Sequence, residues 1–442
     1  MESINTQVRK KIVIKAGGSI LAREESFQSV AASIMSYLGT YDLIFVVVSA
    51  PTGITNMITT LLDCHDDSER EMIINRVINV LRSAGCDRKR EDFIIGNIRT
   101  YSSLFNRTGN RRYSDLALIQ GELFSSEQLA STLIENGSDN VKIIDPATFL
   151  HFKSGPNKEL IFDEIKSKSS FQSIIKIIED YRILIVPGFY GINGNGKIIT
   201  IGRGGSDLTA SLVSILTQAD KLEFWKDVNG IYSMDPNHFN GSVKINEIST
   251  QNAALLDLLG SRILQEKSIT SLLNYPVIPD VEVRAVTSRE RGTKLGNKNS
   301  FDFLVSVLDN ASVRIYLKKF NESDQLKLHN IWNSQHISIG HNLFMEIGRE
   351  KFKRMKNAAS TILSSRINSS IISLFIGDYM GRYSYSFFKR IKSSINQIIP
   401  NADIYYSQEL NIIFIVGAHE MRENIINCIR VTIAEVQETW TR

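Results

Sequence analysis

Residues 188–236 read GFYGINGNGKIITIGRGGSDLTASLVSILTQADKLEFWKDVNGIYSMDP. A glycine-rich turn in this stretch precedes an apolar helical pattern, and a strand and a second turn follow it. In the first turn, Gly204 and Gly205 have no side chains, so the backbone can approach a bound anion. We expect the next helix to begin near Ser206, with its N–H groups directed at that anion. The stretch therefore predicts a site for a small charged molecule.

Two charged residues belong to the same turn. Arg203 offers a planar donor fork that suits a carboxylate. Asp207 falls in the first turn of the predicted helix, where a negative charge stabilises the helix and can hold a lysine or a metal. The alternative is that Ser206 and Asp207 only cap the helix, since a cap needs no more than Ser, Thr, Asp or Asn.

The N-terminal segment supplies a second polar turn. Residues 12–14 form a short β-branched run, Lys15 follows, and Gly17, Gly18 and Ser19 then lead into a helical pattern. A lysine at the carboxyl end of a first strand is the layout of ligand sites in open α/β sheets. We therefore expect a phosphate there. KAGGS matches neither GxxxxGK[ST] nor GxGxxG, so a plain strand-to-helix turn is the alternative.

Continuous apolar runs predict the sheet. Residues 43–48 are apolar on both faces and lead into SAPTGITNM, which contains Ser49 and Thr55. Residues 183–186 and 221–224 repeat the pattern between helical segments, and residues 63–114 indicate helices inserted after the second strand. Such runs, alternating with helices, are typical of an α/β fold with a parallel sheet buried on both faces.

Six motifs occur in order over residues 11–296: KAGGSIL, VVVSAPTGITNM, GELFSS, GFYG, TIGRGGSD and WKDVNGIYSMDP. In this order they resemble the aspartokinases of the amino acid kinase family. The resemblance implies a three-layer sandwich with a mostly parallel central sheet. It also implies transfer of the ATP γ-phosphoryl to the side-chain carboxylate of L-aspartate, giving 4-phospho-L-aspartate. That reaction opens the pathway to lysine, through diaminopimelate, and to threonine and methionine.

The resemblance also implies residue roles. Lys15 would stabilise the phosphoryl oxygens, and Asp207 would orient Lys15 and reach Mg²⁺ through water, with no dedicated metal ligands. Arg203 would bind the α-carboxylate of aspartate and Glu122 its ammonium; the latter otherwise reads as a solvated helix residue. Further substrate contacts would come from Ser49, Thr55 and Ser206. The ATP, brought with Mg²⁺, would contact Lys15, Gly17, Gly18, Ser19, Lys226, Asp227, Tyr232, Asp235 and Arg262.

The chain departs from the family pattern in two motifs. GSRILQE at residues 260–266 stands where the family usually has GAKVLHP, so Arg262 replaces a lysine and Gln265 a histidine. Lys226 and Asn237 stand on either side of the nucleotide turn, where the family usually has a threonine and an arginine. These changes leave two alternatives open: a non-catalytic amino-acid-sensing regulator, or a related kinase acting on another acidic substrate.

Composition narrows the class of protein. The chain has 442 residues, 43% of them hydrophobic and 22% charged, as in ordinary globular proteins of about two or three domains. A formal net charge of +4 is too small to favour nucleic acid. No apolar run approaches the ~18 residues of a membrane span, so we expect neither a membrane anchor nor export. Three separated cysteines suit a reducing cytoplasm, where we place the protein.

The pattern changes after the polar segment 288–300, so we divide the chain into a catalytic domain, 1–298, and a regulatory region, 299–442. Shorter elements follow, which match two ferredoxin-like modules. We expect strands at 312–317, 337–346, 371–376, 403–406 and 411–416 and helices at 323–333, 383–395 and 422–436. In this position the modules resemble paired ACT domains, which implies an amino-acid effector, with lysine favoured, and a homodimer or higher homo-oligomer. A dimerisation platform without a sensing role is the alternative.

Overall fold

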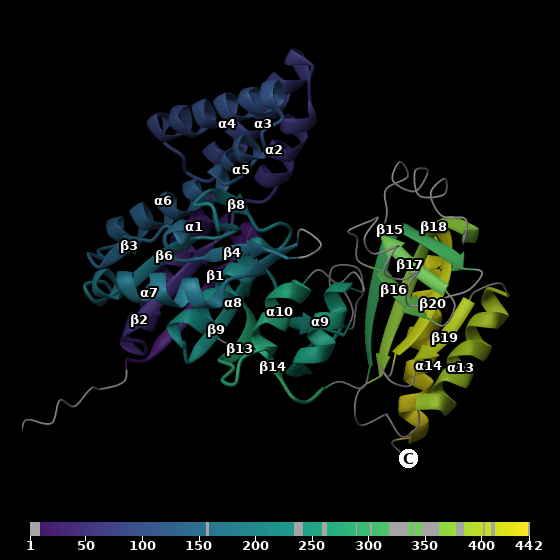
Figure 1. Ribbon diagram of the computed structural model, residues 1–442. Helices are drawn as coiled ribbons and strands as arrows, with labels where there is room; N and C mark the ends of the chain where they lie inside the picture. The colour runs from purple at the N-terminus through teal and green to yellow at the C-terminus, as the bar shows by residue number, and fades with distance from the viewer. Residues whose placement is uncertain are drawn as a thin grey trace, which may run out of the picture. The chain divides into compact units, whose positions relative to one another are not determined.

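The chain forms two compact units, Met1–Ile231 with Lys267–Leu295 and Tyr232–Glu266 with Gly296–Arg442. The computed structural model describes residues 9–155, 159–233, 242–258, 263–288, 290–300, 303–317, 336–339, 342–346, 362–376, 384–400, 403–407 and 412–440. Each unit has its own sheet and helices (Figure 1). The functional boundary near residue 298 stays a prediction.

A mostly parallel sheet organises the first unit. Its strands are β1 (Lys11–Ala16), β2 (Leu43–Val48), β3 (Val141–Ile143), β6 (Ile183–Pro187), β9 (Lys221–Lys226), β13 (Asp280–Ala285) and β14 (Thr293–Gly296). They run in the order β14-β13-β9-β1-β2-β6-β3. All these pairs are parallel except β13 with β14. Every residue of β2 and β6 is buried, as the continuous apolar runs predicted.

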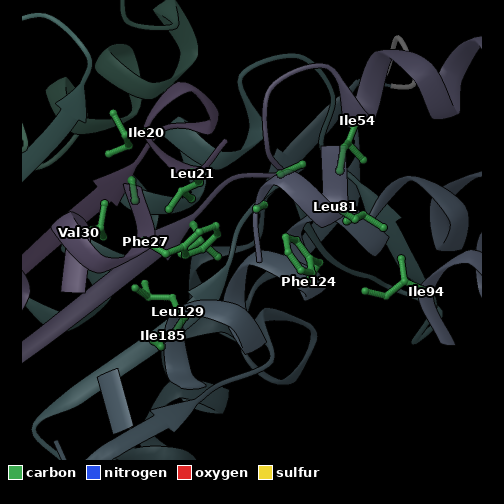
Figure 2. Packing of buried hydrophobic residues seen from close by; sticks show 14 of the residues in the cluster. Ile20, Leu21, Phe27, Val30, Ile54, Leu81, Ile94, Phe124, Leu129 and Ile185 are labelled. Atoms are coloured by element: carbon green, nitrogen blue, oxygen red, sulfur yellow. The ribbon is translucent and has the colours of Figure 1, made fainter. Parts of the chain in front are cut away.

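Helices cover both faces of this sheet. On one face, α1 (Glu24–Ser36) and α6 (Gln120–Glu135) share a core with Ile44, and the rings of Phe27 and Phe124 meet edge to face at 6.2 Å (Figure 2). On the other face, Phe45 packs on Phe171 of α7 (Glu164–Glu179). The α7 helix contacts α8 (Gly205–Thr217), which lies against β1. Because neighbouring strand residues point to opposite faces, the result is the predicted three-layer sandwich.

Four helices are inserted after β2, as expected: α2 (Ile54–Asp63), α3 (Asp67–Ser83), α4 (Arg88–Thr108) and α5 (Arg111–Leu118). Their ends follow from local chemistry. The side chains of Asp66, Asp87 and Asn110 each accept a hydrogen bond from a backbone N–H in the first turn of α3, α4 and α5. Gly109, with φ of 64°, ends α4 in the left-handed conformation that glycine adopts readily.

A second, smaller sheet precedes the glycine-rich turn, which connects its last strand to α8. Its strands are β4 (His151–Ser154), β5 (Leu160–Phe162), β7 (Tyr190–Asn193) and β8 (Ile198–Thr200), in the order β5-β4-β7-β8. The Thr200 hydroxyl donates to the buried Asp115 carboxylate over 2.7 Å, which fixes the end of β8 to α5. The short helix α10 (Glu266–Leu273) contacts α8, where the Ser268 hydroxyl lies 2.7 Å from the Ser211 hydroxyl.

The second unit contains an antiparallel sheet of order β16-β17-β15-β18-β20-β19. Its elements are β15 (Phe303–Leu317), β16 (His336–Ile339), β17 (Asn342–Glu346), β18 (Ile362–Ile376), α13 (Ser384–Ile398), β19 (Asp403–Ser407), β20 (Ile412–Ala418) and α14 (Arg422–Trp440). Buried residues of β18, β20, α13 and α14 form one apolar core. Short elements elsewhere are β10 (Ile231–Tyr232), β11 (Lys244–Ile245), β12 (Glu247–Ser249) and α9 (Thr250–Leu258).

Three sequence expectations for this unit need correction or lie outside the description. The strand expected at 337–346 is a pair of antiparallel strands, β16 and β17. The expected strands at 312–317 and 371–376 are the ends of two strands of 15 residues each, β15 and β18. The helix expected at 323–333 lies outside the described residues.

Among the helices that the structure describes, none has the length and apolar character needed to cross a bilayer.

Candidate active site

A buried ion pair joins the two segments that the sequence singled out. Lys15 lies at the carboxyl end of β1 and Asp207 in the first turn of α8. The Lys15 Nζ lies 2.7 Å from the Asp207 Oδ1, and the two side chains are 7% and 8% exposed. Because an ion pair this buried loses most of its hydration, each charge depends on the other. The sequence predicted that Asp207 would hold a lysine, and that lysine is Lys15.

The turn before α8 needs glycine at more than one position. Gly204 is the N-cap of α8 and has a φ of 70°, so neither Ser206 nor Asp207 occupies the capping position. The interpretation of these two residues as a simple cap is therefore wrong. A Cβ on Gly205 would lie 2.8 Å from a ring carbon of Phe189, closer than packed atoms tolerate. Phe189 itself has a φ of 77°, which is uncommon for a residue with a side chain.

The glycine turn after β1 lies directly beside the Lys15 ammonium. The Gly17 N–H donates to the Trp225 carbonyl over 3.3 Å, and a Cβ on Gly17 would lie 3.5 Å from the Lys15 Nζ. A Cβ on Gly18 would overlap the Ala50 carbonyl oxygen. Ser19, in the 3-10 turn Gly18–Leu21, is exposed. Gly17 therefore leaves bare backbone beside the ammonium at this edge of the sheet.

Lys226 places a second ammonium near Asp207. It ends β9, the strand beside β1, and its Nζ lies 4.0 Å from the Asp207 Oδ2. The side chain is 18% exposed, more open than that of Lys15. Asp227, the next residue, is exposed.

Glu122 is buried, so its interpretation as a solvated helix residue is wrong. It lies in the first turn of α6 and is 3% exposed. Burial raises the pKa of Glu122 to about 8, although the Ala50 N–H, its own N–H and the Lys15 charge favour the ionised form. Within the described residues, its Oε2 has no hydrogen-bond partner. A buried carboxylate oxygen without a partner is costly unless a ligand pairs with it.

Tyr190 is a further site residue that the sequence did not assign. The side chain is 1% exposed and its hydroxyl is hydrogen-bonded to Asp145. Burial, followed by the charges of Asp145 and Glu122, raises the pKa of Tyr190. The only signal in the sequence was its place in the GFYG motif.

The remaining predicted residues are more scattered. Ser49 follows β2 and donates its N–H to the Ala16 carbonyl over 3.2 Å, and Thr55, half-buried, lies in the first turn of α2. Ser206 is 8% exposed and packs against Gly188, whereas Arg203 is exposed. Tyr232 belongs to the second unit, and Asp235 and Arg262 lie outside the described residues. The structure thus groups Lys15, Asp207, Lys226, Gly17 and Glu122.

The sequence profile of the amino acid kinase family matches residues 10–276, more than half of the chain. The chain belongs to the amino acid kinase family. The three-layer fold inferred from the motifs agrees with this assignment. The residue roles within the site stay predictions.

Curated relatives of this family member include several aspartokinases. The aspartokinase of Rickettsia felis is 22% identical over 437 residues, which cover 94% of this chain and 97% of the relative. That of Rickettsia conorii is 27% identical over 302 residues, covering 65% of this chain and 64% of the relative. Aspartokinase 2 of Bacillus subtilis is 30% identical over 194 residues, covering 44% and 46%.

Solved structures share the fold. Escherichia coli aspartokinase III in complex with aspartate and ADP has a TM-score of 0.77 at 18% identity, covering 96% of this chain and 99% of that one. The T-state of the same enzyme with lysine and aspartate has a TM-score of 0.69 at 18% identity, covering 95% and 98%. The fold class expected from the sequence, including the C-terminal region, is therefore confirmed.

Proposed function

We propose that this chain is an aspartate kinase, which transfers the γ-phosphoryl of ATP to the side-chain carboxylate of L-aspartate. The observation that carries the proposal is the buried Lys15–Asp207 pair beside the unpartnered oxygen of Glu122. A cation for a phosphoryl group and an acid for an ammonium are what this reaction requires. The aspartokinase of Rickettsia felis, which matches nearly the whole chain, supports the choice of substrate.

Phosphoryl transfer asks the protein mainly to align two anions and to neutralise charge. Lys15 supplies an ammonium at the carboxyl end of β1, and Asp207 holds it in place. The backbone N–H groups of Gly18 and Ser19 would add donors to the phosphoryl oxygens, whereas the Gly17 N–H donates to the Trp225 carbonyl and Gly17 would only let the phosphate approach closely. The attacking carboxylate is already ionised near neutral pH, so the reaction needs no general base.

Substrate selection would use both ends of the amino acid. Glu122 would pair with the ammonium, and that pairing would supply the partner its Oε2 lacks among the described residues. Arg203, exposed on the turn before α8, would bind the α-carboxylate as a bidentate donor. Ser49, Thr55 and Ser206 would complete the contacts.

The nucleotide would enter with Mg²⁺. Proteins usually hold this ion through one or two carboxylates, substrate phosphates and water. Asp207 would take that role, because its carboxylate lies beside the Lys15 ammonium that we assign to the phosphoryl group. The ion would neutralise phosphate charge. Lys226, Asp227, Tyr232, Asp235 and Arg262 are the residues we assign to the nucleotide.

The second unit would regulate the kinase. Its antiparallel sheet contains the strands of both predicted modules, with β15 of the first paired to β18 of the second. Lysine is the effector we favour, because E. coli aspartokinase III crystallises with lysine in its T-state. Regulation requires the effector to bind two conformations unequally. We further propose a homodimer or higher oligomer, located in the cytosol, that supplies the lysine, threonine and methionine pathways.

A coupled assay of ADP release with L-aspartate and MgATP tests the activity. The wild-type chain should turn over steadily, and Lys15→Ala should abolish turnover while retaining the fold by circular dichroism. Replacing L-aspartate with L-glutamate provides the substrate control. A wild-type chain that binds aspartate without releasing ADP would instead favour the non-catalytic regulator, and preference for another acidic substrate would favour a related kinase.

A further inference from the structure

The backbone carbonyl of Asp207 is hydrogen-bonded to a helix from a distant part of the chain. Ser268 lies in the first turn of α10, and its hydroxyl donates to the Asp207 carbonyl oxygen over 3.0 Å. The same hydroxyl lies 2.7 Å from that of Ser211, which is one helical turn beyond Asp207 in α8. Ser268 thus joins α10 to the turn of α8 that carries the Asp207 carboxylate.

Each hydroxyl in this contact has a single proton, which sets the direction of the bonds. Because Ser268 donates to the Asp207 carbonyl, the Ser211 hydroxyl donates to the Ser268 oxygen. Ser211 and Ser268 are fully buried, and Asp207 is buried as well. A hydrogen bond in such surroundings is costly to lose, because water does not replace the missing partner.

Helix α8 does not need the bond from Ser268 to complete its own hydrogen bonding. A helix leaves N–H groups unpaired at its start, whereas the carbonyls there accept from the N–H groups four residues further on. A carbonyl oxygen has two lone pairs, so the Asp207 carbonyl can accept from Ser268 in addition. The added bond therefore fixes α8 against α10, whose Ile269 and Leu272 are also buried.

The side chain of Asp207 is the part of this residue that the proposed reaction uses. Its Oδ1 lies 2.7 Å from the Lys15 Nζ, and both side chains are buried. Because the carbonyl and the carboxylate belong to one residue, a shift of the first turn of α8 moves the carboxylate and the ammonium that it holds. A misplacement of about 1 Å in a reacting site can lower the rate about 10²-fold.

We propose that Ser268 is a positioning residue for the Lys15–Asp207 pair, acting through the Asp207 carbonyl. This inference rests on the proposed kinase function. Ser268 holds the first turn of α8 in place, and that turn holds the Asp207 carboxylate against the Lys15 ammonium. Loss of the Ser268 hydroxyl should therefore act on the reaction more than on the stability of the fold.

Three variants separate positioning from a purely structural role. Ser268→Ala removes the bond to Asp207 and also takes the acceptor from the buried Ser211 hydroxyl. Ser211→Ala is the matched control, because it removes the neighbouring buried hydroxyl and keeps the bond from Ser268 to Asp207. The double variant Ser211→Ala/Ser268→Ala lacks the bond to Asp207 but leaves neither hydroxyl unpaired, so it should recover stability relative to Ser268→Ala.

ADP release by the full chain with L-aspartate and MgATP measures the effect on turnover. For Ser268→Ala and for the double variant, kcat should fall about tenfold, with the KM for aspartate within about twofold of the wild type. For Ser211→Ala, kcat should stay within about twofold. The double variant keeps the test open if Ser268→Ala does not fold. Normal kcat in the double variant, or an equal loss of kcat in Ser211→Ala, would overturn the proposal.

Calorimetric titration with a non-hydrolysable ATP analogue and Mg²⁺ gives a readout that needs no turnover. The double variant should bind the analogue about fivefold more weakly, because Lys15 would contact the γ-phosphoryl group, and Ser211→Ala should change the affinity less than about twofold. If the wild type releases no ADP with aspartate, yet these affinities differ as expected, the kinase proposal fails and the positioning by Ser268 stands. A wild type that neither turns over nor binds the analogue would overturn both proposals.

Discussion

Strand β9 has a charged cluster near each end, and the two clusters differ in how their carboxylates are paired. At its start, Lys221 pairs with Glu223 and Glu282, each at 2.7 Å, and Arg284 lies 3.6 Å from Glu223. Two cations thus meet two anions. Burial alone would lower the pKa of Lys221. Hydrogen bonds and charge pairing with Glu223 and Glu282 together outweigh it, so the pKa of Lys221 is raised.

The cluster at the end of β9 lies at the predicted ligand site. Lys226 and Lys15 share the single carboxylate of Asp207, and the nearby Glu122 has an oxygen without a hydrogen-bond partner among the described residues. A buried network whose charges pair with one another stabilises the fold without a ligand. We therefore expect changes in the first cluster to act mainly on stability and changes in the second to act mainly on turnover.

The largest expected effect is on turnover. Lys15→Met should lower kcat for aspartate phosphorylation about 10³-fold, since it removes a fixed charge that faces the phosphoryl group. Stability should also fall, by about 2 kcal/mol, because the Asp207 carboxylate stays buried and loses the ammonium 2.7 Å away. ADP release and thermal melting measure the two effects. If Lys15→Met lost much stability but kept normal turnover, this cluster would be structural and the proposed role of Lys15 would be wrong.

A change in the cluster around Lys221 should lower stability and leave turnover unchanged. Glu223 is fully buried, and its Oε2 accepts hydrogen bonds from the Tyr37 hydroxyl and the Trp225 indole N–H, both at 2.8 Å. Glu223→Gln keeps much of the shape but leaves the cations short of a partner, so it should cost about 3 kcal/mol of stability. We expect Tm to fall by about 6 to 12 °C, with kcat unchanged at temperatures where the variant is folded.

The raised pKa of Glu122 predicts that the difference in stability between the wild type and Glu122→Gln depends on pH. Its folded-state pKa is raised from 4.5 to about 8, so its ionisation disfavours the fold. This cost is absent below pH 4.5, grows as the pH rises to about 8, and is constant above that. Glu122→Gln should therefore gain about 3 kcal/mol relative to the wild type between pH 5 and pH 8. An equal Tm difference at both pH values would contradict the raised pKa.

Much of the first unit could be predicted from the sequence. The β-branched runs placed Lys15 at a strand end, and the position of Asp207 in a first helical turn suggested its pairing with a lysine. The burial of Glu122 could not be predicted from its helix, because α2 and the end of β2 cover it from elsewhere in the chain: Gly121 lies against Ala50 and Ile54. The left-handed backbone of Phe189 has no sequence signal, and its close packing on Gly205 joins residues that the sequence does not mark as neighbours.

The second unit shows a different limit. Asp309 and Asn310 interrupt the apolar pattern of β15, so the sequence predicted only its later part. In the structure, the pairing of β15 with β18 shifts register between Leu308 and Ser312 and again before Arg314. Such irregularities let a strand continue through residues that disfavour regular pairing. A pattern of period two cannot anticipate them.

Proton release on aspartate binding tests most directly whether Glu122 receives the substrate ammonium. Because the pKa of Glu122 is about 8, the free site is mostly protonated at pH 7, and pairing with an ammonium requires its ionisation. Titration calorimetry in buffers of different ionisation enthalpy counts the protons. We predict release of close to one proton per aspartate bound by the wild type and close to none by Glu122→Gln. Binding of aspartate by the wild type without proton release at pH 7 would contradict the account.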